Sequence, residues 1–228
     1  MEIREIFNLV KNKRRKILLN PEAKSVLAAW GIPVVETKTA KSKDEAIKCS
    51  FELGFPVAMK INSYDLIHKT DARSVVLNLK SQKEVEDTYN KFMETAKKSE
   101  FPIKVEGVII EKMVYGIECI IGVIDDPQFG HVIMFGTGGI FVEILNDVSF
   151  RLIPINEIDA EEMIKEIKGY NILKGYRGIK GDLKTLKNIL IKVSNLVINF
   201  PEIKEIDLNP IFTSSSSTVV SDARIRIE

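Results

Sequence analysis

Three short apolar runs decide the fold class of this chain: residues 108–113 (VIIEKM), 117–123 (IECIIGV) and 131–135 (HVIMF). Each run has the length of a strand and is rich in β-branched residues, and only a short turn separates it from the next. Strands joined by short turns pair antiparallel, because a parallel neighbour needs a much longer crossover connection. The sequence therefore predicts an antiparallel sheet in the centre of the chain.

Helices alternate with strands on the N-terminal side of these runs. Asn20 is placed to cap a helix that has Pro21 at its first position, and Ser42 and Ser81 are placed to cap two others. The expected helices lie at residues 3–18, 21–30, 43–53 and 82–98, and the expected strands at 56–61 and 74–79.

On the C-terminal side, helices are expected at residues 159–173 and 182–199, and strands at 203–209 and 219–227. Helices combined with an antiparallel sheet predict an α/β protein built from α+β lobes. The expected lobe boundary lies between residues 102 and 111.

Composition narrows the class of protein. A net charge of +1 gives no global basic field, so neither nucleic acid nor a membrane surface is an expected partner. The basic run at residues 11–16 is expected to be a solvated helix face. No signal peptide is evident, and Cys49 and Cys119 lack the spacing of metal ligands. We expect a cytoplasmic protein with reduced thiols.

The polar segment at residues 63–71 (SYDLIHKTD) is the first candidate site. It contains His68, one of only two histidines, between two apolar strands. Neutral imidazole has a lone pair that can attack phosphorus, so this side chain could carry a phosphoryl group. A solvated loop histidine is the alternative.

A glycine-rich stretch and a strand lysine are candidate phosphate ligands. Residues 135–143 (FGTGGIFVE) contain three glycines within four positions, which allow backbone amides to approach an anion. Lys60, near the end of an apolar strand, could place an ammonium group on a phosphate. A tight hairpin and a solvent-directed lysine are the respective alternatives.

Acidic and amide side chains near the C-terminus form a candidate metal site. Glu205, Asp207 and Asn209 share one face of a strand because side chains alternate with period two, and Asp222 lies on the following strand. Oxygen ligands of this kind suit Mg²⁺. A solvent-facing polar edge is the alternative.

From about residue 20 to residue 227, the chain resembles the ATP-grasp beta subunits of ADP-forming acetyl-CoA synthetases, which are relatives of succinyl-CoA synthetase. Six fragments match the family's motifs in the family's order: residues 27–34 with "yGIPV", 52–60 with "lGyPVvlK", 63–71 with "SPDILHKSD", 122–139 with "GvxxDpqFGpvimfGxGG", 207–210 with "DxNP" and 222–224 with "DAR". The order makes the resemblance specific.

The resemblance implies an ATP-grasp fold with nucleotide between two lobes. The expected parts are an N-terminal helix, residues 1–20, packed on the larger lobe, a smaller lobe, residues 21–105, which carries His68, and a larger lobe, residues 106–228. The larger lobe is expected to hold the hinge and the metal site.

The resemblance also implies a ligase subunit that uses ATP/ADP and Mg²⁺. A CoA-binding alpha subunit, expected in a complex of two alpha and two beta chains, would form an acyl phosphate and then a phosphohistidine. His68 would carry that phosphoryl group to ADP. The implied ligands are Lys60 at the phosphates, Glu111, Lys112, Met113 and Val114 beside adenine, Glu118 at the ribose, Gly138, Gly139 and Glu143 near the phosphates, and Asp207, Asn209 and Asp222 around Mg²⁺.

Two alternatives remain open, and a departure from the family motivates the first of them. The family's "HKSDxGGV" has paired glycines where this chain has Arg73 and Ser74. A non-catalytic nucleotide-binding or assembly subunit is the first alternative. A stand-alone ATP-grasp carboxylate ligase, with no use for His68, is the second.

Overall fold

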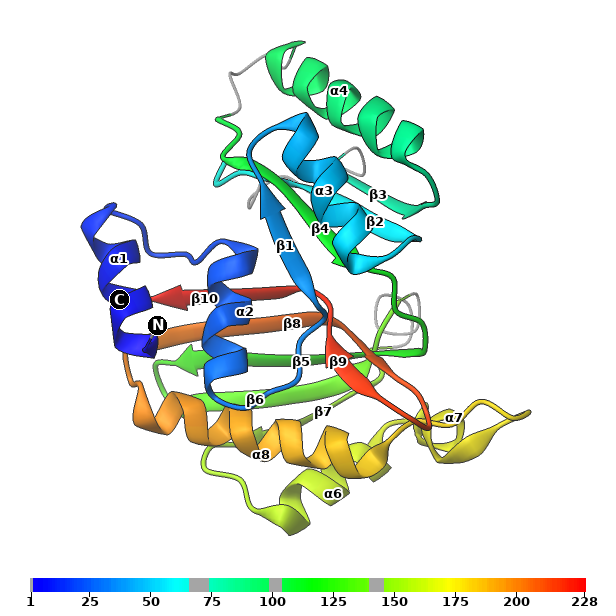
Figure 1. Ribbon diagram of the computed structural model, residues 1–228. Coiled ribbons are helices and arrows are strands. Elements are labelled where there is room, and N and C mark those ends of the chain that lie inside the picture. The colour runs from blue at the N-terminus through cyan, green and yellow to red at the C-terminus, as the bar shows by residue number, and fades with distance from the viewer. Residues whose placement is uncertain (1, 66–73, 99–103, 140–145) are drawn as a thin grey trace. The chain divides into compact units, whose positions relative to one another are not determined.

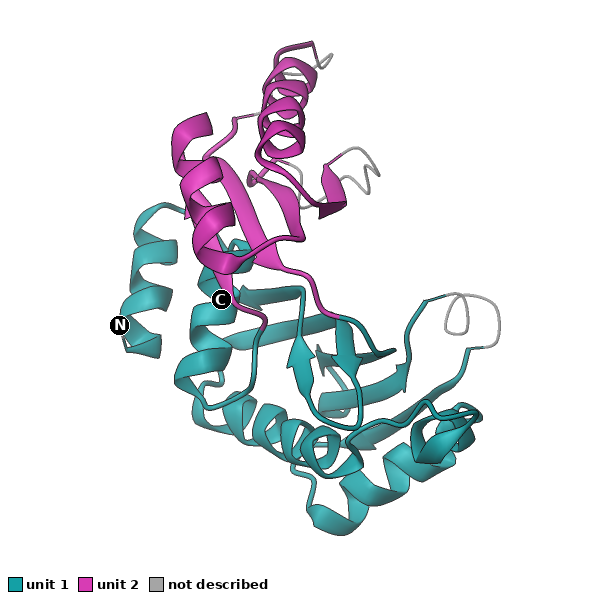
Figure 2. Cartoon of the chain, turned by 45° about the vertical axis from the view of Figure 1, so that its right-hand side comes forward, with its two compact units in different colours: residues 1–34, 115–228 teal, residues 35–114 magenta. Residues whose placement is uncertain are grey.

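The computed structural model describes residues 2–65, 74–98, 104–139 and 146–228. The chain forms two compact units (Figure 2): unit 1 consists of residues 1–34 and 115–228, and unit 2 of residues 35–114. The expected division into residues 1–20, 21–105 and 106–228, with a separate role for each part, stays a prediction.

Unit 1 contains a six-stranded sheet in the order β10-β8-β5-β6-β7, with β9 paired to β8. Each of these pairs is antiparallel. The strands are β5 Ile117–Asp126, β6 Gly130–Thr137, β7 Val148–Leu152, β8 Ile203–Thr213, β9 Thr218–Val220 and β10 Ala223–Ile227. The predicted antiparallel sheet is therefore confirmed.

The helices of unit 1 contribute to one core with this sheet (Figure 1). They are α1 Ile3–Asn12, α2 Asn20–Ala29, α6 Glu157–Glu166, α7 Tyr170–Gly175 and α8 Leu183–Asn199. Alternation along β5 buries Ile121 and Val123 in this core, whereas Ile124 is 55% exposed. The opposite face of the sheet thus carries the outward side chains of β5 and β8.

Unit 2 contains a four-stranded sheet in the order β1-β4-β2-β3, with antiparallel pairs. Its strands are β1 Thr37–Ala40, β2 Val57–Asn62, β3 Val75–Leu79 and β4 Gly107–Lys112, and its helices are α3 Lys43–Leu53 and α4 Gln82–Lys98. Buried side chains from both helices, including Ala46 and Phe92, complete its core.

The position of β4 corrects one expectation. The runs at 108–113, 117–123 and 131–135 were expected in one sheet, but β4 pairs with β1 and β2 in unit 2, and β5 and β6 pair in unit 1. The short segment after β4 joins two compact units rather than two paired strands. Spacing along the chain could not distinguish these two connections.

Several element boundaries also differ from the expected ones. The first helix ends at Asn12 instead of residue 18, and Arg14 adopts a positive φ of 53° directly afterwards. Asn20 is the first residue of α2, with Leu19 as N-cap. The expected helix 159–173 is two helices, the expected strand 219–227 is two strands, and β7 was not expected. The predicted caps Ser42 and Ser81 do accept from the Glu45 and Glu84 amides, at 3.2 and 3.3 Å.

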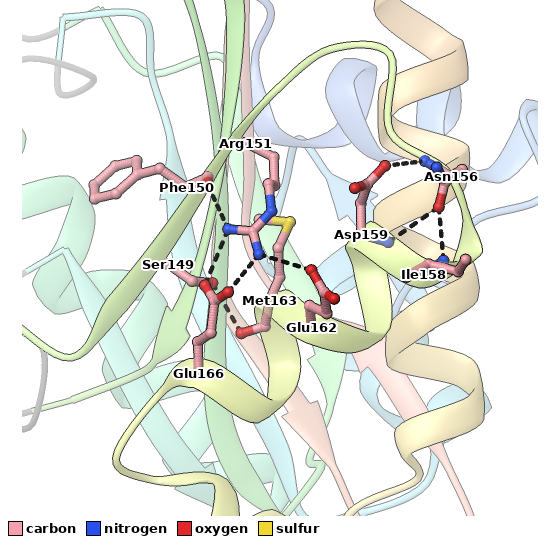
Figure 3. A network of polar contacts seen from close by, with 9 residues as sticks. All are labelled: Ser149, Phe150, Arg151, Asn156, Ile158, Asp159, Glu162, Met163 and Glu166. Carbon is pink, nitrogen blue, oxygen red and sulfur yellow. Dashed lines mark hydrogen bonds and ion pairs between the residues drawn. The ribbon is translucent and has the colours of Figure 1, made fainter.

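Polar contacts hold α6 against the edge strand β7 (Figure 3). Ser149 Oγ donates to the Met163 carbonyl at 2.9 Å, and the Arg151 guanidinium lies between Glu162 and Glu166. The hydrogen bond from Arg151 lowers the pKa of Glu166. Because both carboxylates are exposed, these ion pairs stabilise the fold by less than about 1 kcal/mol.

Across the described parts of the chain, no helix has the length and apolar character needed to cross a bilayer.

Candidate nucleotide and metal site

Three of the predicted metal ligands come together at the β8–β10 pair of unit 1. The side chains of Asp207 and Asn209 point outward from β8. They alternate along the strand with Ile206 and Leu208, whose side chains are buried. The register pairs Ala223 with Leu208, and the Asn209 amide donates to the Asp222 carbonyl at 3.2 Å. The structure therefore brings Asp207, Asn209 and Asp222 to one face of the sheet.

Two further residues complete this cluster. Asn20 donates from Nδ2 to Asp222 Oδ1 at 2.5 Å, and Arg224 pairs in register with Asp207. Within the described residues, the buried Nε atom of Arg224 has no hydrogen-bond partner. Glu205 has a different partner, because Arg226 Nε donates to it at 3.1 Å. The sequence thus grouped Glu205 with the metal ligands, whereas the structure pairs it with arginine.

The surroundings of Asp207 raise its pKa. Burial raises its pKa, and the neighbouring Asp222 carboxylate raises it further, while Arg224 opposes both effects. An apolar pocket of about 250 Å³ adjoins Asp207, and Ile124, Met134 and Phe150 are among its lining residues. A low-dielectric neighbour of this kind disfavours the ionised carboxylate.

The donor set fits a hard divalent cation. Asp207, Asn209 and Asp222 offer carboxylate and amide oxygens, the ligand type that Mg²⁺ prefers. The described part of the chain contains no cluster of three or more His, Cys, Asp or Glu residues able to hold a metal ion. Two carboxylates and an amide would therefore need further oxygens, and nucleotide phosphates are a suitable source. The unpartnered Nε of Arg224 is a donor that a phosphate oxygen could accept.

The raised pKa of Asp207 predicts an unusual dependence of stability on pH. Between the unfolded and folded pKa values the folded chain binds more protons, so stability falls as pH rises through that window. Asp207→Asn should therefore stabilise the metal-free protein at neutral pH, by less than about 1 kcal/mol because the carboxylate keeps contact with water. The gain should disappear below the unfolded pKa of an aspartate.

Thermal unfolding at a series of pH values, in chelator and in Mg²⁺, measures this effect. Glu205→Gln is the matched control, because its carboxylate is paired with Arg226. A loss of stability in Asp207→Asn at neutral pH without metal would contradict the prediction. In excess Mg²⁺ the wild type should gain stability and Asp207→Asn should gain less.

Lys60, which is half-buried, forms an ion pair with the buried Glu111 in unit 2. Lys60 Nζ lies 2.9 Å from Glu111 Oε2, and the side chains are 12% and 2% exposed. Adjacent strands bring them together, since β2 and β4 pair Ala58 with Glu111 and Lys60 with Ile109. Thr37 Oγ1 lies 3.3 Å from Glu111 Oε1. The sequence predicted both residues for nucleotide binding but not their contact with each other.

The segment expected beside adenine begins at this pair. β4 ends at Lys112, whose amide donates to the Glu36 carbonyl at 3.1 Å. Lys112 is exposed, and Met113 and Val114 are half-buried. Glu111 directs its side chain to Lys60, so a contact with adenine from this residue would have to come from its backbone.

The glycine turn is shaped by close packing within unit 1. The Gly138 amide donates to the Glu118 carbonyl at 2.7 Å, and a Cβ at Gly138 would lie 2.7 Å from the Glu118 Cβ. Gly139 has a φ of +66°, which favours glycine. The Gly138 amide is thus already bonded to the sheet, and the role of this turn at a phosphate stays a prediction.

Two predicted site residues, His68 and Glu143, lie outside the described residues, as does Arg73. The structure adds Asn20 and Arg224 to the cluster, which the site prediction missed. Arg224 lies within the "DAR" motif, which was a signal in the sequence. Asn20 was expected only to cap a helix.

A six-stranded antiparallel sheet with an outward carboxylate cluster, and a second α/β unit with a half-buried strand lysine, agree with the ATP-grasp class. A family model described as ATP-grasp domain matches residues 9–227. The chain is 49% identical over 224 residues to the acetate–CoA ligase [ADP-forming] I subunit beta of Pyrococcus furiosus, a match that covers 97% of this chain and 96% of the relative. The chain belongs to the family of beta subunits of ADP-forming acetate–CoA ligases.

Solved structures agree with this assignment. A dinucleotide forming acetyl-coenzyme A synthetase 1 from Ca. Korarchaeum cryptofilum, in complex with coenzyme A, Ca-AMPCP and HgCl+, superposes with a TM-score of 0.94 at 42% identity and covers 99% of both chains. A second structure of that protein contains coenzyme A and Mg-AMPPCP and has its phosphohistidine segment pointing towards the nucleotide binding site. It matches with a TM-score of 0.85 at 39% identity over 100% of both chains.

Proposed function

We propose that this chain is the nucleotide-binding subunit of an ADP-forming acetyl-CoA synthetase and transfers a phosphoryl group between His68 and ADP/ATP. The identity of 49% over nearly the full length of a named beta subunit is the observation that carries this proposal. The oxygen cluster at Asp207, Asn209 and Asp222 and the half-buried Lys60 of unit 2 agree with it.

The residues of the chain contribute to phosphoryl transfer in two ways: some neutralise charge and others position the reacting groups. In the direction of ATP use, an imidazole nitrogen of His68 forms a P–N bond as the bond from the γ-phosphorus to the bridging oxygen breaks, and ADP leaves. Lys60 neutralises phosphate charge, Glu111–Val114 contacts adenine, and Glu118 contacts the ribose. Gly138, Gly139 and Glu143 line the phosphate side of the site.

Asp207, Asn209 and Asp222 would hold Mg²⁺, which supplies positive charge to the phosphate oxygens when bound. Arg224 adds a donor at the same face of the sheet. Asn20 orients Asp222 through the hydrogen bond to its Oδ1 atom. The oxygen ligands are thereby held in place by two strands and the start of one helix.

The partner would be a CoA-binding alpha subunit, because the similar chain of Pyrococcus furiosus is named as a subunit beta. We propose a complex of two alpha and two beta chains. We place the reaction in the cytoplasm, where free thiols such as those of Cys49 and Cys119 persist.

Acyl-CoA synthesis tests this function against a stand-alone ligase. The chain alone, given acetate, CoA and Mg·ATP, is expected to form neither acetyl-CoA nor acyl phosphate. Addition of a family alpha subunit should give acetyl-CoA and ADP in equal amounts. Acyl phosphate made by the isolated chain would overturn the proposal in favour of a stand-alone carboxylate ligase.

A further inference from the structure

We propose that Asp147 is a positioning residue that fixes the glycine turn at Gly138 and Gly139 for nucleotide binding. The inference rests on the proposed function, because it assigns the turn to the phosphate side of the nucleotide site. Its evidence is a buried hydrogen-bond node, built by Asp147, Thr137, Lys168 and Gly169, that the sequence did not predict.

The Asp147 side chain accepts three hydrogen bonds although the residue is only 4% exposed. Its Oδ2 atom accepts from Thr137 Oγ1 at 3.0 Å and from the Gly169 amide at 2.8 Å. Its Oδ1 atom accepts from the Lys168 amide at 2.5 Å. A single carboxylate thus joins the end of β6 to the connection between α6 and α7.

This node requires a carboxylate. A carboxylate only accepts, and all three neighbours are donors. An asparagine has one acceptor oxygen, so its NH₂ group would face a donor on one side and leave that donor unsatisfied. Such a mismatch is costly in a buried position.

The node acts directly on the base of the glycine turn. Thr137 is the last residue of β6 and immediately precedes Gly138. The Gly138 amide donates to the Glu118 carbonyl on β5. The Thr137 hydroxyl donates to Asp147, which immediately precedes β7. The turn is therefore anchored from both neighbouring strands.

Close packing adds to these hydrogen bonds. A Cβ at Gly169 would lie 2.2 Å from Thr137 Cγ2 and 3.1 Å from Asp147 Oδ2, so only glycine leaves room for this arrangement. A Cβ at Gly136 would lie 2.8 Å from the Asp147 carbonyl oxygen. The side chain of Thr137 is consequently fixed by packing on one side and by a hydrogen bond on another.

Two variants disturb this anchor and two serve as controls. Asp147→Asn leaves one of the three donors without an acceptor, and Thr137→Val breaks the hydrogen bond between the two residues. Thr137→Ser keeps the hydroxyl and is the conservative variant that should rescue binding. Ser194→Ala removes another buried hydrogen bond of unit 1, the one that Ser194 Oγ accepts from the Ile155 amide at 3.1 Å, away from the turn.

The dissociation constant of Mg·ADP, measured calorimetrically on the full chain, is the main readout. We expect an increase of about tenfold for Asp147→Asn and Thr137→Val, and less than about twofold for Thr137→Ser and Ser194→Ala. Thermal unfolding should show similar losses for Ser194→Ala and Thr137→Val, which separates binding from general stability. Amide exchange at Gly138 without nucleotide should accelerate only in the first pair.

Unchanged nucleotide affinity in both Asp147→Asn and Thr137→Val would overturn the inference, provided that the wild type binds Mg·ADP. Equal loss of affinity in Ser194→Ala would overturn it too, because the effect would then follow stability alone. Failure of the wild type to bind any nucleotide would instead refute the proposed function.

Discussion

His68→Ala is expected to abolish phosphorylation of the chain. Wild type incubated with Mg·ATP should gain one phosphate that is labile in acid and stable in base, as a phosphoramidate is. The alanine side chain has no nitrogen that could attack phosphorus, so the variant lacks the proposed phosphoryl acceptor. With an alpha subunit present, acetyl-CoA synthesis by the variant should fall by at least about a thousandfold.

Intact-mass measurement after acid or base treatment detects this phosphate. His131→Ala is the matched control, because His131 is the other histidine of the chain and its Nε2 lies 2.9 Å from the Ile203 carbonyl within the sheet of unit 1. This control should remain phosphorylated. Phosphate retained in His68→Ala and lost in His131→Ala would reverse the assignment.

The replacement of the family's glycine pair by Arg73 and Ser74 bears on this experiment. A phosphorylated wild type would make that replacement a tolerated variation. A wild type that binds nucleotide but takes no phosphate, even with an alpha subunit, would favour a non-catalytic subunit. Restoring glycine at both positions then tests whether the replacement itself prevents phosphorylation.

The fold was predictable where local pattern and tertiary structure agree. The strands near residues 57–62 and 131–135 and the caps Ser42 and Ser81 follow from apolar periodicity and side-chain hydrogen bonding. β7 was missed because its sequence, VSFRL, is short and the side chain that it buries, Ser149, is polar rather than apolar. The break between α6 and α7 was missed because its cause is distant: Asp147 draws the amides of Lys168 and Gly169 out of the helix.

The candidate site was predictable as a set of residue types but not as a set of contacts. Period two placed Asp207 and Asn209 on one face, as the structure has them. The same rule placed Glu205 on that face, where it lines the same pocket as Asp207, but it could not show that the Glu205 carboxylate pairs with Arg226. Asn20 and Lys60 each pair with a residue far along the chain. Such pairings depend on the order of the strands in the sheets rather than on the spacing of residues in the sequence.

Lys60→Met is expected to weaken both nucleotide binding and the fold. The ammonium group is proposed to neutralise phosphate charge, and loss of a charge-assisted contact in a largely buried site should raise the dissociation constant of Mg·ATP by about a hundredfold. The change also deprives Glu111, which is 2% exposed, of its ammonium partner at 2.9 Å. We expect the free energy of unfolding to fall by about 3 kcal/mol.

A second substitution separates these two effects. In Lys60→Met/Glu111→Gln the uncompensated carboxylate is gone, so much of the lost stability should return while the affinity for Mg·ATP stays low. Lys38→Met is the control, since Lys38 pairs with the exposed Glu52 in the same unit. It should change neither quantity appreciably. If Lys60→Met lowered stability but bound Mg·ATP as tightly as wild type, the lysine would serve only as the partner of Glu111, and the phosphate contact would have to come from another cation.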